Sequence, residues 1–83
     1  MNSDGLIGFV YNHDGYWSEG SKQHEEAKTT IECAETCLED CVAFNGNDNG
    51  VCFHYSERSN IVDDNKKEQY GNKAYVKCQG INQ

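Results

Sequence analysis

Four of the five cysteines stand close together in this 83-residue chain, and their spacing limits its fold more than any other feature. Cys33, Cys37 and Cys41 follow one another with three residues between neighbours. Cys52 comes after ten more residues, and Cys78 stands apart after a further 25. Two cysteines four positions apart on a helix lie on neighbouring parts of one face. The cluster can therefore join a helix to the segments that follow it, or it can bind a metal ion.

Disulfides, zinc binding and free thiols are the three uses that this spacing allows. A bridge that closes a loop of about 20 residues stabilises a fold by roughly 3 kcal/mol in the chain-entropy account. A zinc site would use several of the thiolates and His54. Structural zinc sites prefer two paired clusters with two to four residues between ligands, whereas Cys52 and His54 have one residue between them. The spacing therefore favours disulfides, and we expect no metal or other cofactor.

The large apolar residues are too few for an ordinary core. Leu, Ile, Val and Phe account for 14 of the 83 residues, and the formal net charge is −7. Chains with so little apolar surface and so much charge usually stay unfolded, and small domains bury little surface even when folded. Cross-links would supply the missing stability. The composition and the cysteines together predict one small disulfide-stabilised domain over residues 1–83.

The acidic character of the chain excludes two classes of partner. It has 14 acidic and 7 basic side chains, so phosphate backbones and anionic membrane surfaces repel it. The longest apolar stretch, residues 6–11, is too short to cross a bilayer. We expect neither a nucleic-acid partner nor membrane insertion. The first residues lack the basic and apolar regions of a signal peptide, so a secreted protein would be represented here by its mature form or an expressed domain.

Local sequence patterns predict one strand and one helix before Cys41. Residues 6–11 are rich in β-branched and aromatic side chains, which favours a strand. Residues 29–32 fit a capping box, the pattern in which a threonine and a glutamate satisfy the first amides of a helix. The apolar stripe of this helix would be Ile31, Ala34 and Leu38.

A hairpin and a last strand follow the predicted helix. Residues 42–44 and 51–55 are apolar runs that flank two Asn-Gly pairs, and such pairs accept the positive φ values of hairpin turns. Residues 73–78 alternate as a strand does, and residues 61–62 form a short strand or an anchor. The order strand, helix, hairpin, strand predicts an α+β fold in which a small antiparallel sheet packs on one helix.

The segment ECAETCLEDCVAFNGNDNGVCFHY, residues 32–55, resembles the core of the PAN/apple domain family. Members carry a cysteine pair on a helix, then Cys-x-Ala-Phe at the start of a strand, then a cysteine on the partner strand of the hairpin. Cys33, Cys37, residues 41–44 and Cys52 match that order, and residues 74–78 match the last strand. The resemblance covers residues 29–78.

The resemblance implies about five antiparallel strands packed on one helix, with the bridges Cys33–Cys52 and Cys37–Cys41. Two departures from the family pattern concern the cysteines. The gap between Cys37 and Cys41 is shorter than in most members, and no cysteine precedes Cys33 to pair with Cys78. Cys78 then has three possible states. It is a free thiol, either buried or exposed, or it forms a bridge to another chain, for example in a homodimer. The third possibility is a bridge whose other cysteine lies outside this sequence.

The resemblance also implies a non-catalytic extracellular binding module, either secreted or part of a cell-surface protein. Such modules bind proteins or carbohydrates in adhesion or as lectin-like units, and segments 12–28 and 56–72 are where we expect the binding surface, because loops carry function. A small secreted inhibitor or effector that blocks a partner surface is the first rival. A zinc-stabilised intracellular interaction domain is the second. No phosphate loop, nucleophile elbow or zinc-protease motif is present, so we predict no enzyme.

Four side chains are candidates for ligand contact. His13, Tyr16 and Trp17 lie in a polar, glycine-containing segment, and aromatic rings beside polar groups commonly stack on sugars or anchor protein interfaces. Trp17 could instead fill the core. Arg58 is the only arginine and could bind a carboxylate or a sialic-acid-like group with two hydrogen bonds, or pair with a neighbouring acidic residue.

Overall fold

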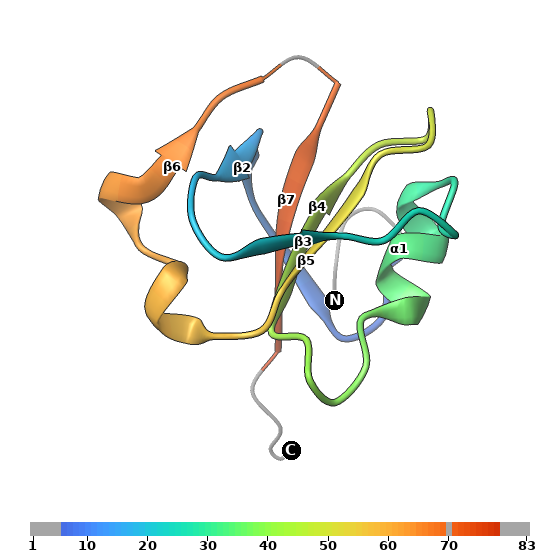
Figure 1. The fold of residues 1–83 in the computed structure, drawn as a ribbon, viewed down its shortest axis with the longest axis horizontal. Coiled ribbons are helices and arrows are strands. Elements are labelled where there is room, and N and C mark those ends of the chain that lie inside the picture. Colours follow the sequence, from blue (N-terminus) through green and yellow to red (C-terminus); the bar gives the residue numbers. More distant parts are fainter. Residues whose placement is uncertain (1–5, 70, 79–83) are drawn as a thin grey trace.

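The computed structural model describes residues 6–69 and 71–78, so the domain predicted over residues 1–83 includes positions outside them. A main sheet has five antiparallel strands in the order β1-β7-β4-β5-β3, and a second sheet pairs β2 with β6 (Figure 1). The strands are β1 Phe9–Asp14, β2 Tyr16–Trp17, β3 Ser21–Gln23, β4 Ala43–Gly46, β5 Cys52–Tyr55, β6 Lys66–Lys67 and β7 Lys73–Lys77.

A single α-helix is found in the described residues, α1 (Thr30–Thr36), and it packs against β4 and β5. Two short 3-10 helices, Arg58–Asn60 and Asp63–Asn65, connect β5 to β6. The predicted α+β fold, a five-stranded antiparallel sheet with one helix, is confirmed. No helix in residues 6–69 and 71–78 has the length and apolar character of a membrane span.

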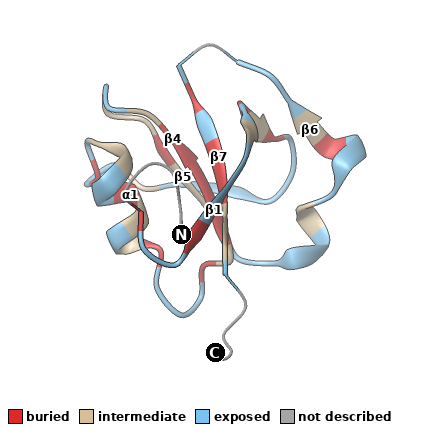
Figure 2. Cartoon of the chain, turned by 180° about the vertical axis from the view of Figure 1, so that it is seen from behind, coloured by how far each residue is buried: buried red, intermediate tan, exposed pale blue. Residues whose placement is uncertain are grey.

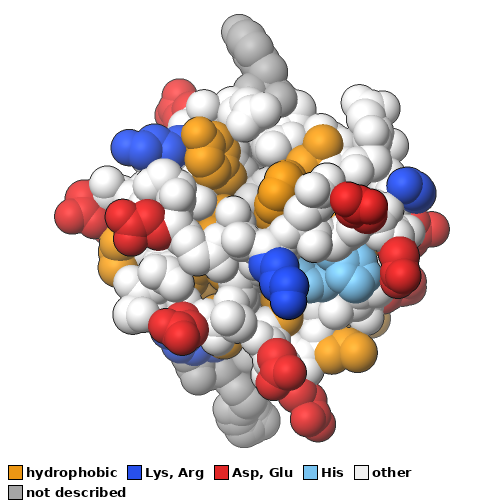
Figure 3. Space-filling model, in the orientation of Figure 1, with side chains coloured by type: hydrophobic (Ala, Val, Ile, Leu, Met, Phe, Trp, Pro, Cys, Tyr) orange, Lys and Arg blue, Asp and Glu red, His pale blue; other side chains and the backbone are white. Residues whose placement is uncertain are grey.

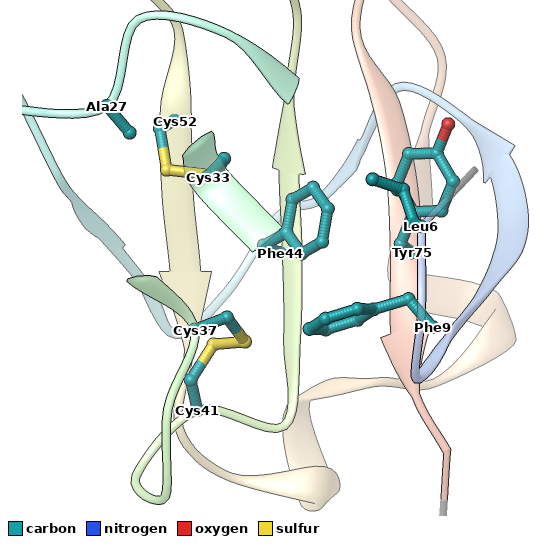
Figure 4. Packing of buried hydrophobic residues seen from close by; sticks show 9 residues of the cluster. All are labelled: Leu6, Phe9, Ala27, Cys33, Cys37, Cys41, Phe44, Cys52 and Tyr75. Carbon is teal, nitrogen blue, oxygen red and sulfur yellow. A yellow bond between two sulfur atoms is a disulfide. The ribbon is translucent and has the colours of Figure 1, made fainter. Parts of the chain in front are cut away.

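The register of the main sheet divides the core into two parts, because neighbouring residues on a strand point to opposite faces. Phe44 lies opposite Tyr75, and both rings face α1. This helix-side core is shown in Figure 4 and consists of Leu6, Phe9, Ala27, Cys33, Cys37, Cys41, Phe44, Cys52 and Tyr75. The tryptophan-side core on the other face consists of Trp17, Ala43, Tyr55 and Ala74. Buried residues therefore gather on the central strands β4, β5 and β7, as Figure 2 shows.

Two disulfides hold the helix-side core together. Cys33–Cys52 joins α1 to β5 with a Cα–Cα distance of 5.5 Å, and Cys37–Cys41 closes the turn after α1 with a Cα–Cα distance of 4.9 Å. These are the pairs that the resemblance implies. The short second ring is possible because α1 ends at Thr36, so that Cys37 is its C-cap.

The capping box is confirmed in a modified form. The Thr29 hydroxyl accepts a hydrogen bond from the Glu32 amide at 3.1 Å, as predicted. The Glu32 carboxylate accepts from the Lys28 amide at 2.7 Å, one residue before the N-cap. The Glu32 amide in the first turn and the Lys28 amide before the N-cap therefore both find side-chain partners, and the helix begins where the sequence predicts.

The predicted apolar stripe of the helix is wrong. Ile31 is 54% exposed and Leu38 is 67% exposed, and Leu38 lies beyond the last helical residue. The side of α1 that faces the sheet carries Cys33 and Cys37 instead, with Ala34 partly buried beside them. The disulfides decide the rotation of the helix, because the bridge to β5 requires Cys33 to face the sheet.

The first strand also begins later than predicted. Gly8 has a φ of 88°, a value that favours glycine, and it turns the chain before β1 begins at Phe9. Leu6 lies before this turn and is buried in the helix-side core. Segment 12–28, which gives no periodic signal, contributes the end of β1 and the whole of β2 and β3.

Candidate functional site

The two segments predicted to carry the binding surface, 12–28 and 56–72, lie side by side (Figure 1). Both residues of β2 pair with both residues of β6. Beyond this pairing, the Ser18 amide donates to the Asn65 carbonyl at 3.0 Å. Residues almost 50 positions apart thus form one continuous surface on the tryptophan side of the main sheet.

A hollow of about 310 Å³ opens between β2 and the main sheet, and we call it the amide hollow. Two partly buried aromatic residues line it, Tyr16 from β2 and Phe53 from β5. Three amide side chains, a hydroxyl and a valine complete the lining, namely Asn45, Gln69, Asn72, Ser21 and Val51. The hollow therefore combines apolar ring faces with hydrogen-bonding groups of both polarities.

A network of hydrogen bonds fixes the buried amides beneath the hollow. Asn45 is 2% exposed, and its Nδ2 donates to Tyr55 Oη at 2.9 Å. Asn72 Nδ2 lies 3.4 Å from Asn45 Oδ1, and Asn47 Nδ2 donates to Asn72 Oδ1 at 2.8 Å. Buried amides with several fixed partners hold one orientation, so the floor of the hollow is rigid before any ligand arrives.

Tyr55 joins this network to β2. Its hydroxyl donates to the Trp17 carbonyl at 2.6 Å and accepts from the Trp17 amide at 3.0 Å. Burial raises the pKa of Tyr55 above that of an exposed tyrosine. One buried hydroxyl thus holds β2 against the main sheet and sets the position of Tyr16 beside it.

A second, charged hollow of about 450 Å³ adjoins the first and shares Gln69 and Asn72 with it. Asp14, Glu68 and Lys73 supply its charged lining. The Asp14 carboxylate accepts hydrogen bonds from the Tyr11 hydroxyl at 2.6 Å and from Lys73 Nζ at 3.2 Å, and these bonds lower the pKa of Asp14. Two carboxylates against one ammonium group give this neighbouring surface an excess of negative charge.

The structure brings three of the four predicted ligand residues together. The Trp17 ring is 1% exposed and packs edge-on against His13 and Tyr55, with centroid distances of 4.9 and 5.2 Å. His13 Nε2 lies 2.9 Å from the Tyr16 carbonyl oxygen, so it holds the backbone of β2. Of these three residues, Tyr16 is the one that lines the amide hollow.

Arg58 lies apart from the other candidates. Its guanidinium donates to the Lys77 carbonyl at 3.4 Å. Lys77 ends β7, whereas the amide hollow adjoins the start of that strand at Asn72. Arg58 is absent from the lining of both hollows described above.

Six residues of the amide hollow are missing from the named sequence-based candidates, although three of them lie in the predicted segments 12–28 and 56–72. The six are Ser21, Asn45, Val51, Phe53, Gln69 and Asn72. Asn45 was expected in the hairpin turn, but β4 extends to Gly46 and places Asn45 inside the sheet. A polar residue directly after the apolar run of residues 42–44 was the signal that could have found it. Gln69 and Asn72 carry no such signal, because only the pairing of β2 with β6 brings them to this surface.

A separate group of residues lies on the helix side of the sheet, where His54 adjoins the Cys33–Cys52 bridge. His54 Nε2 lies 3.4 Å from Cys52 Sγ, and the ring stacks on His24 at a centroid distance of 4.8 Å. Burial lowers the pKa of His54. Cys78 lies elsewhere and is a free, exposed thiol just past the end of β7, which excludes the buried position on the strand.

Comparisons with known proteins give this surface no counterpart. No family model, no curated protein and no solved structure matches the chain.

Proposed function

We propose that this chain is a non-catalytic binding module of the PAN/apple type whose amide hollow holds a neutral sugar unit of a glycan. The observation that carries the proposal is the combination of two partly exposed rings, Tyr16 and Phe53, with oriented amides in one hollow. The order and spacing of the cysteines support the proposed membership of this family. The five-stranded sheet packed on one helix supports it as well.

The chemistry of the hollow suits a sugar. One face of a pyranose ring carries C–H groups that stack on an aromatic ring, and its hydroxyls both donate and accept hydrogen bonds. Tyr16 and Phe53 offer the ring faces, and Gln69 offers a donor and an acceptor at the rim. Ligand pockets usually measure about 300–1,000 Å³, so a hollow of about 310 Å³ has room for a single sugar ring.

The charge around the hollow favours a neutral sugar over an acidic one. The chain has a formal net charge of −7, and Asp14 and Glu68 line the adjoining hollow. These carboxylates would repel a sialic acid or a sulfated sugar. Arg58, the residue suited to a carboxylate, lies toward the other end of β7.

Two disulfides in so small a domain are compatible with an extracellular location, where such bonds persist. We accordingly place the module outside the cell, either secreted or within a cell-surface protein. The paired cysteines give less support to a zinc-stabilised intracellular domain.

A protein ligand is the second candidate, because the helix side carries an apolar patch. Ile7 is 92% exposed and Ile31 is 54% exposed, and both line a shallow hollow with Leu6, Phe9 and Ala34. An adhesion contact or an inhibitor that blocks a partner could use this patch. It lies on the opposite face from the amide hollow, so the two candidates predict different sensitive residues.

A glycan array followed by calorimetry with the best glycan tests the proposal. Tyr16→Ala and Phe53→Ala should each weaken binding about tenfold, the loss of a stacking contact of about 1.4 kcal/mol. Tyr16→Phe keeps the ring and should bind nearly as well. Ile31→Ser lies on the other face and should leave affinity unchanged. An array without signal, or binding that depends on Ile31 and not on Tyr16, would overturn the glycan proposal and favour a protein ligand.

A further inference from the structure

The turn that precedes β1 and the helix α1 enclose a shallow hollow of about 240 Å³ on the helix side of the sheet, and we call it the α1 groove. We propose that the α1 groove docks a segment of a partner protein that has an apolar face flanked by Lys and Arg side chains. This docking role rests on the protein ligand named above as the second candidate, to which it adds the chemistry of the partner. It is independent of glycan binding, because the amide hollow lies on the opposite face of the sheet.

Apolar side chains of two elements form the walls of the groove. Ile7 lies beside the turn at Gly8 and is 92% exposed, and Ile31 in the first turn of α1 is 54% exposed. The apolar lining is completed by Leu6, Phe9 and Ala34. Single exposed apolar side chains are common on soluble proteins, but exposed apolar side chains that share one hollow are typical of interaction sites.

The size of the groove favours a side chain of a protein over a separate small molecule. Small-molecule pockets usually measure about 300–1,000 Å³, and the α1 groove is smaller. Protein interfaces commonly depend on a few large side chains that fill such depressions, surrounded by contacts that exclude water. We therefore expect one leucine or phenylalanine side chain of the partner to contact Ile7 and Ile31.

The disulfide that fixes α1 also fixes this wall before a partner arrives. Cys33 faces the sheet because it is bridged to Cys52 on β5, so residues on the other side of α1 face outward. Ile31 and Glu35 are four positions apart on this outward side, and both line the groove. A preformed wall lowers the entropy cost of docking.

The charges beside the groove favour a basic partner. Residues 29–42, which include α1, carry four acidic side chains and no Lys or Arg, whereas residues 6–12 carry no charge. The four are Glu32, Glu35, Glu39 and Asp40, and all are exposed. Figure 3 shows acidic side chains gathered along the side of the molecule where α1 lies. An apolar surface with a negative rim complements a segment that carries apolar and basic side chains.

Two lysines near α1 leave this negative rim in place. The Nζ groups of Lys28 and Lys77 each donate to a backbone carbonyl oxygen, and Lys77 also interacts with the charge of Glu39. Among the residues that the structure describes, no ion pair involves Glu32 or Glu35. The charge beside the groove therefore stays negative.

Fluorescence anisotropy with three designed peptides of equal length tests the proposal on the oxidised full chain. The first peptide is an amphipathic helix of Leu and Lys, the second replaces each Lys by Glu, and the third replaces each Leu by Ser. The Leu/Lys peptide should bind at least about tenfold more tightly than either of the others, because both the apolar and the charged contacts are needed. Its affinity should fall several-fold when the salt concentration rises from about 0.05 M to about 0.5 M, because salt screens exposed charges.

Two variants locate the binding to the α1 groove. Ile31→Ser removes an apolar contact and should weaken binding of the Leu/Lys peptide about tenfold, and Glu35→Gln removes one charge and should weaken it about threefold. Val62→Ser and Glu57→Gln are the matched controls, because they make similar chemical changes at exposed residues between β5 and β6. The affinity of both controls should stay within a factor of about two of that of the native chain.

Several outcomes would overturn the docking proposal. They are no binding of the Leu/Lys peptide, equal binding of the Leu/Glu peptide, or equal losses in Ile31→Ser and Val62→Ser. Far-UV circular dichroism establishes that each variant is folded. Light scattering of the protein alone tests a second copy as the occupant, and a dimer that Ile31→Ser dissociates would replace the basic partner by self-association.

The same variants distinguish the α1 groove from the amide hollow. Tyr16→Ala should leave the peptide affinity unchanged, and Glu35→Gln should leave glycan binding unchanged. Peptide binding without a glycan signal would support docking and contradict the glycan proposal. Glycan binding without peptide binding would contradict docking and leave the glycan proposal in place.

Discussion

Disulfides and aromatic rings fill the helix side of the main sheet, whereas hydrogen bonds between Trp17, Tyr55 and Asn45 hold the tryptophan side. The first face limits the freedom of the unfolded chain and needs little apolar surface to do so. The second face depends on the Tyr55 hydroxyl keeping its partners on Trp17 and Asn45. The face with the hydrogen-bond network is also the one that shapes the amide hollow. A thin core is thus sufficient because cross-links stabilise one face and leave the other to form a polar site.

The largest expected loss comes from Trp17→Ala on the tryptophan side. Its ring is 1% exposed and is the largest side chain in that core, so its removal should lower the free energy of unfolding by about 3–5 kcal/mol. Urea denaturation followed by far-UV circular dichroism measures this. A loss below about 1 kcal/mol would mean that the β2–β6 layer is not part of the cooperative core.

Removal of the Cys33–Cys52 bridge should have the next largest effect. The double variant Cys33→Ala with Cys52→Ala loses a bridge across 19 positions, and we expect a loss of about 3 kcal/mol. The control is Cys78→Ala, which removes an exposed free thiol and should change stability by less than about 0.5 kcal/mol. Equal losses in melting experiments would contradict the assignment of the bridge as the stabilising element of the helix side.

Tyr55→Phe tests the hydrogen bonds of the tryptophan side without changing its shape. The variant leaves the Trp17 amide, the Trp17 carbonyl and the Asn45 amide without their hydroxyl partner. We expect a loss of about 1–3 kcal/mol near neutral pH. A change near zero would mean that apolar packing alone holds β2 in place.

The same tyrosine makes stability depend on alkaline pH. Because burial raises the pKa of Tyr55, the folded state keeps this proton when the unfolded state, with a pKa of about 10, has lost it. The contribution of this group is complete below pH about 10 and declines as the pH rises above that value. The free energy of unfolding, measured by urea denaturation at pH values from about 8 to 11, should fall more steeply with pH for the native chain than for Tyr55→Phe.

The smallest expected effect is that of Ile31→Ser on the helix. Ile31 is 54% exposed, so its loss should change the free energy of unfolding by less than about 0.5 kcal/mol. The sequence-based stripe, in which Ile31 faces the core, predicts a loss of several kcal/mol instead. A thermal melt of this one variant therefore distinguishes the two orientations of α1.

The sequence predicts the helix side well because local patterns encode it. The capping residues 29–32, the cysteine spacing and the Asn-Gly pairs each act over a few positions, and they place α1, β4 and β5. The rotation of α1 was the exception. Cys33 and Cys37 compete with Ile31 and Leu38 for the buried side, and apolar periodicity alone does not show that bridges decide the outcome.

The tryptophan side is hidden from the sequence because it is built from remote pairs. β2 and β6 have two residues each, which is too short for any periodic signal. Tyr16 could be identified as a candidate from its type and surroundings. Asn72 and Gln69 lie in the predicted segment 56–72, but neither could be singled out, because their place in the amide hollow depends on a pairing across some 50 positions.

Because β1 and β7 are paired neighbours in the main sheet, this fold can be inserted into a loop of a larger chain. The Cys78 amide donates to the Gly8 carbonyl at 2.7 Å, so the chain enters and leaves the main sheet at neighbouring points. A loop of a host protein could therefore carry residues 6–78, which include the buried Leu6, as an insert without separating the two ends of that loop. The host would keep its own backbone path, and the amide hollow, at the far end of β7, would face away from the junction.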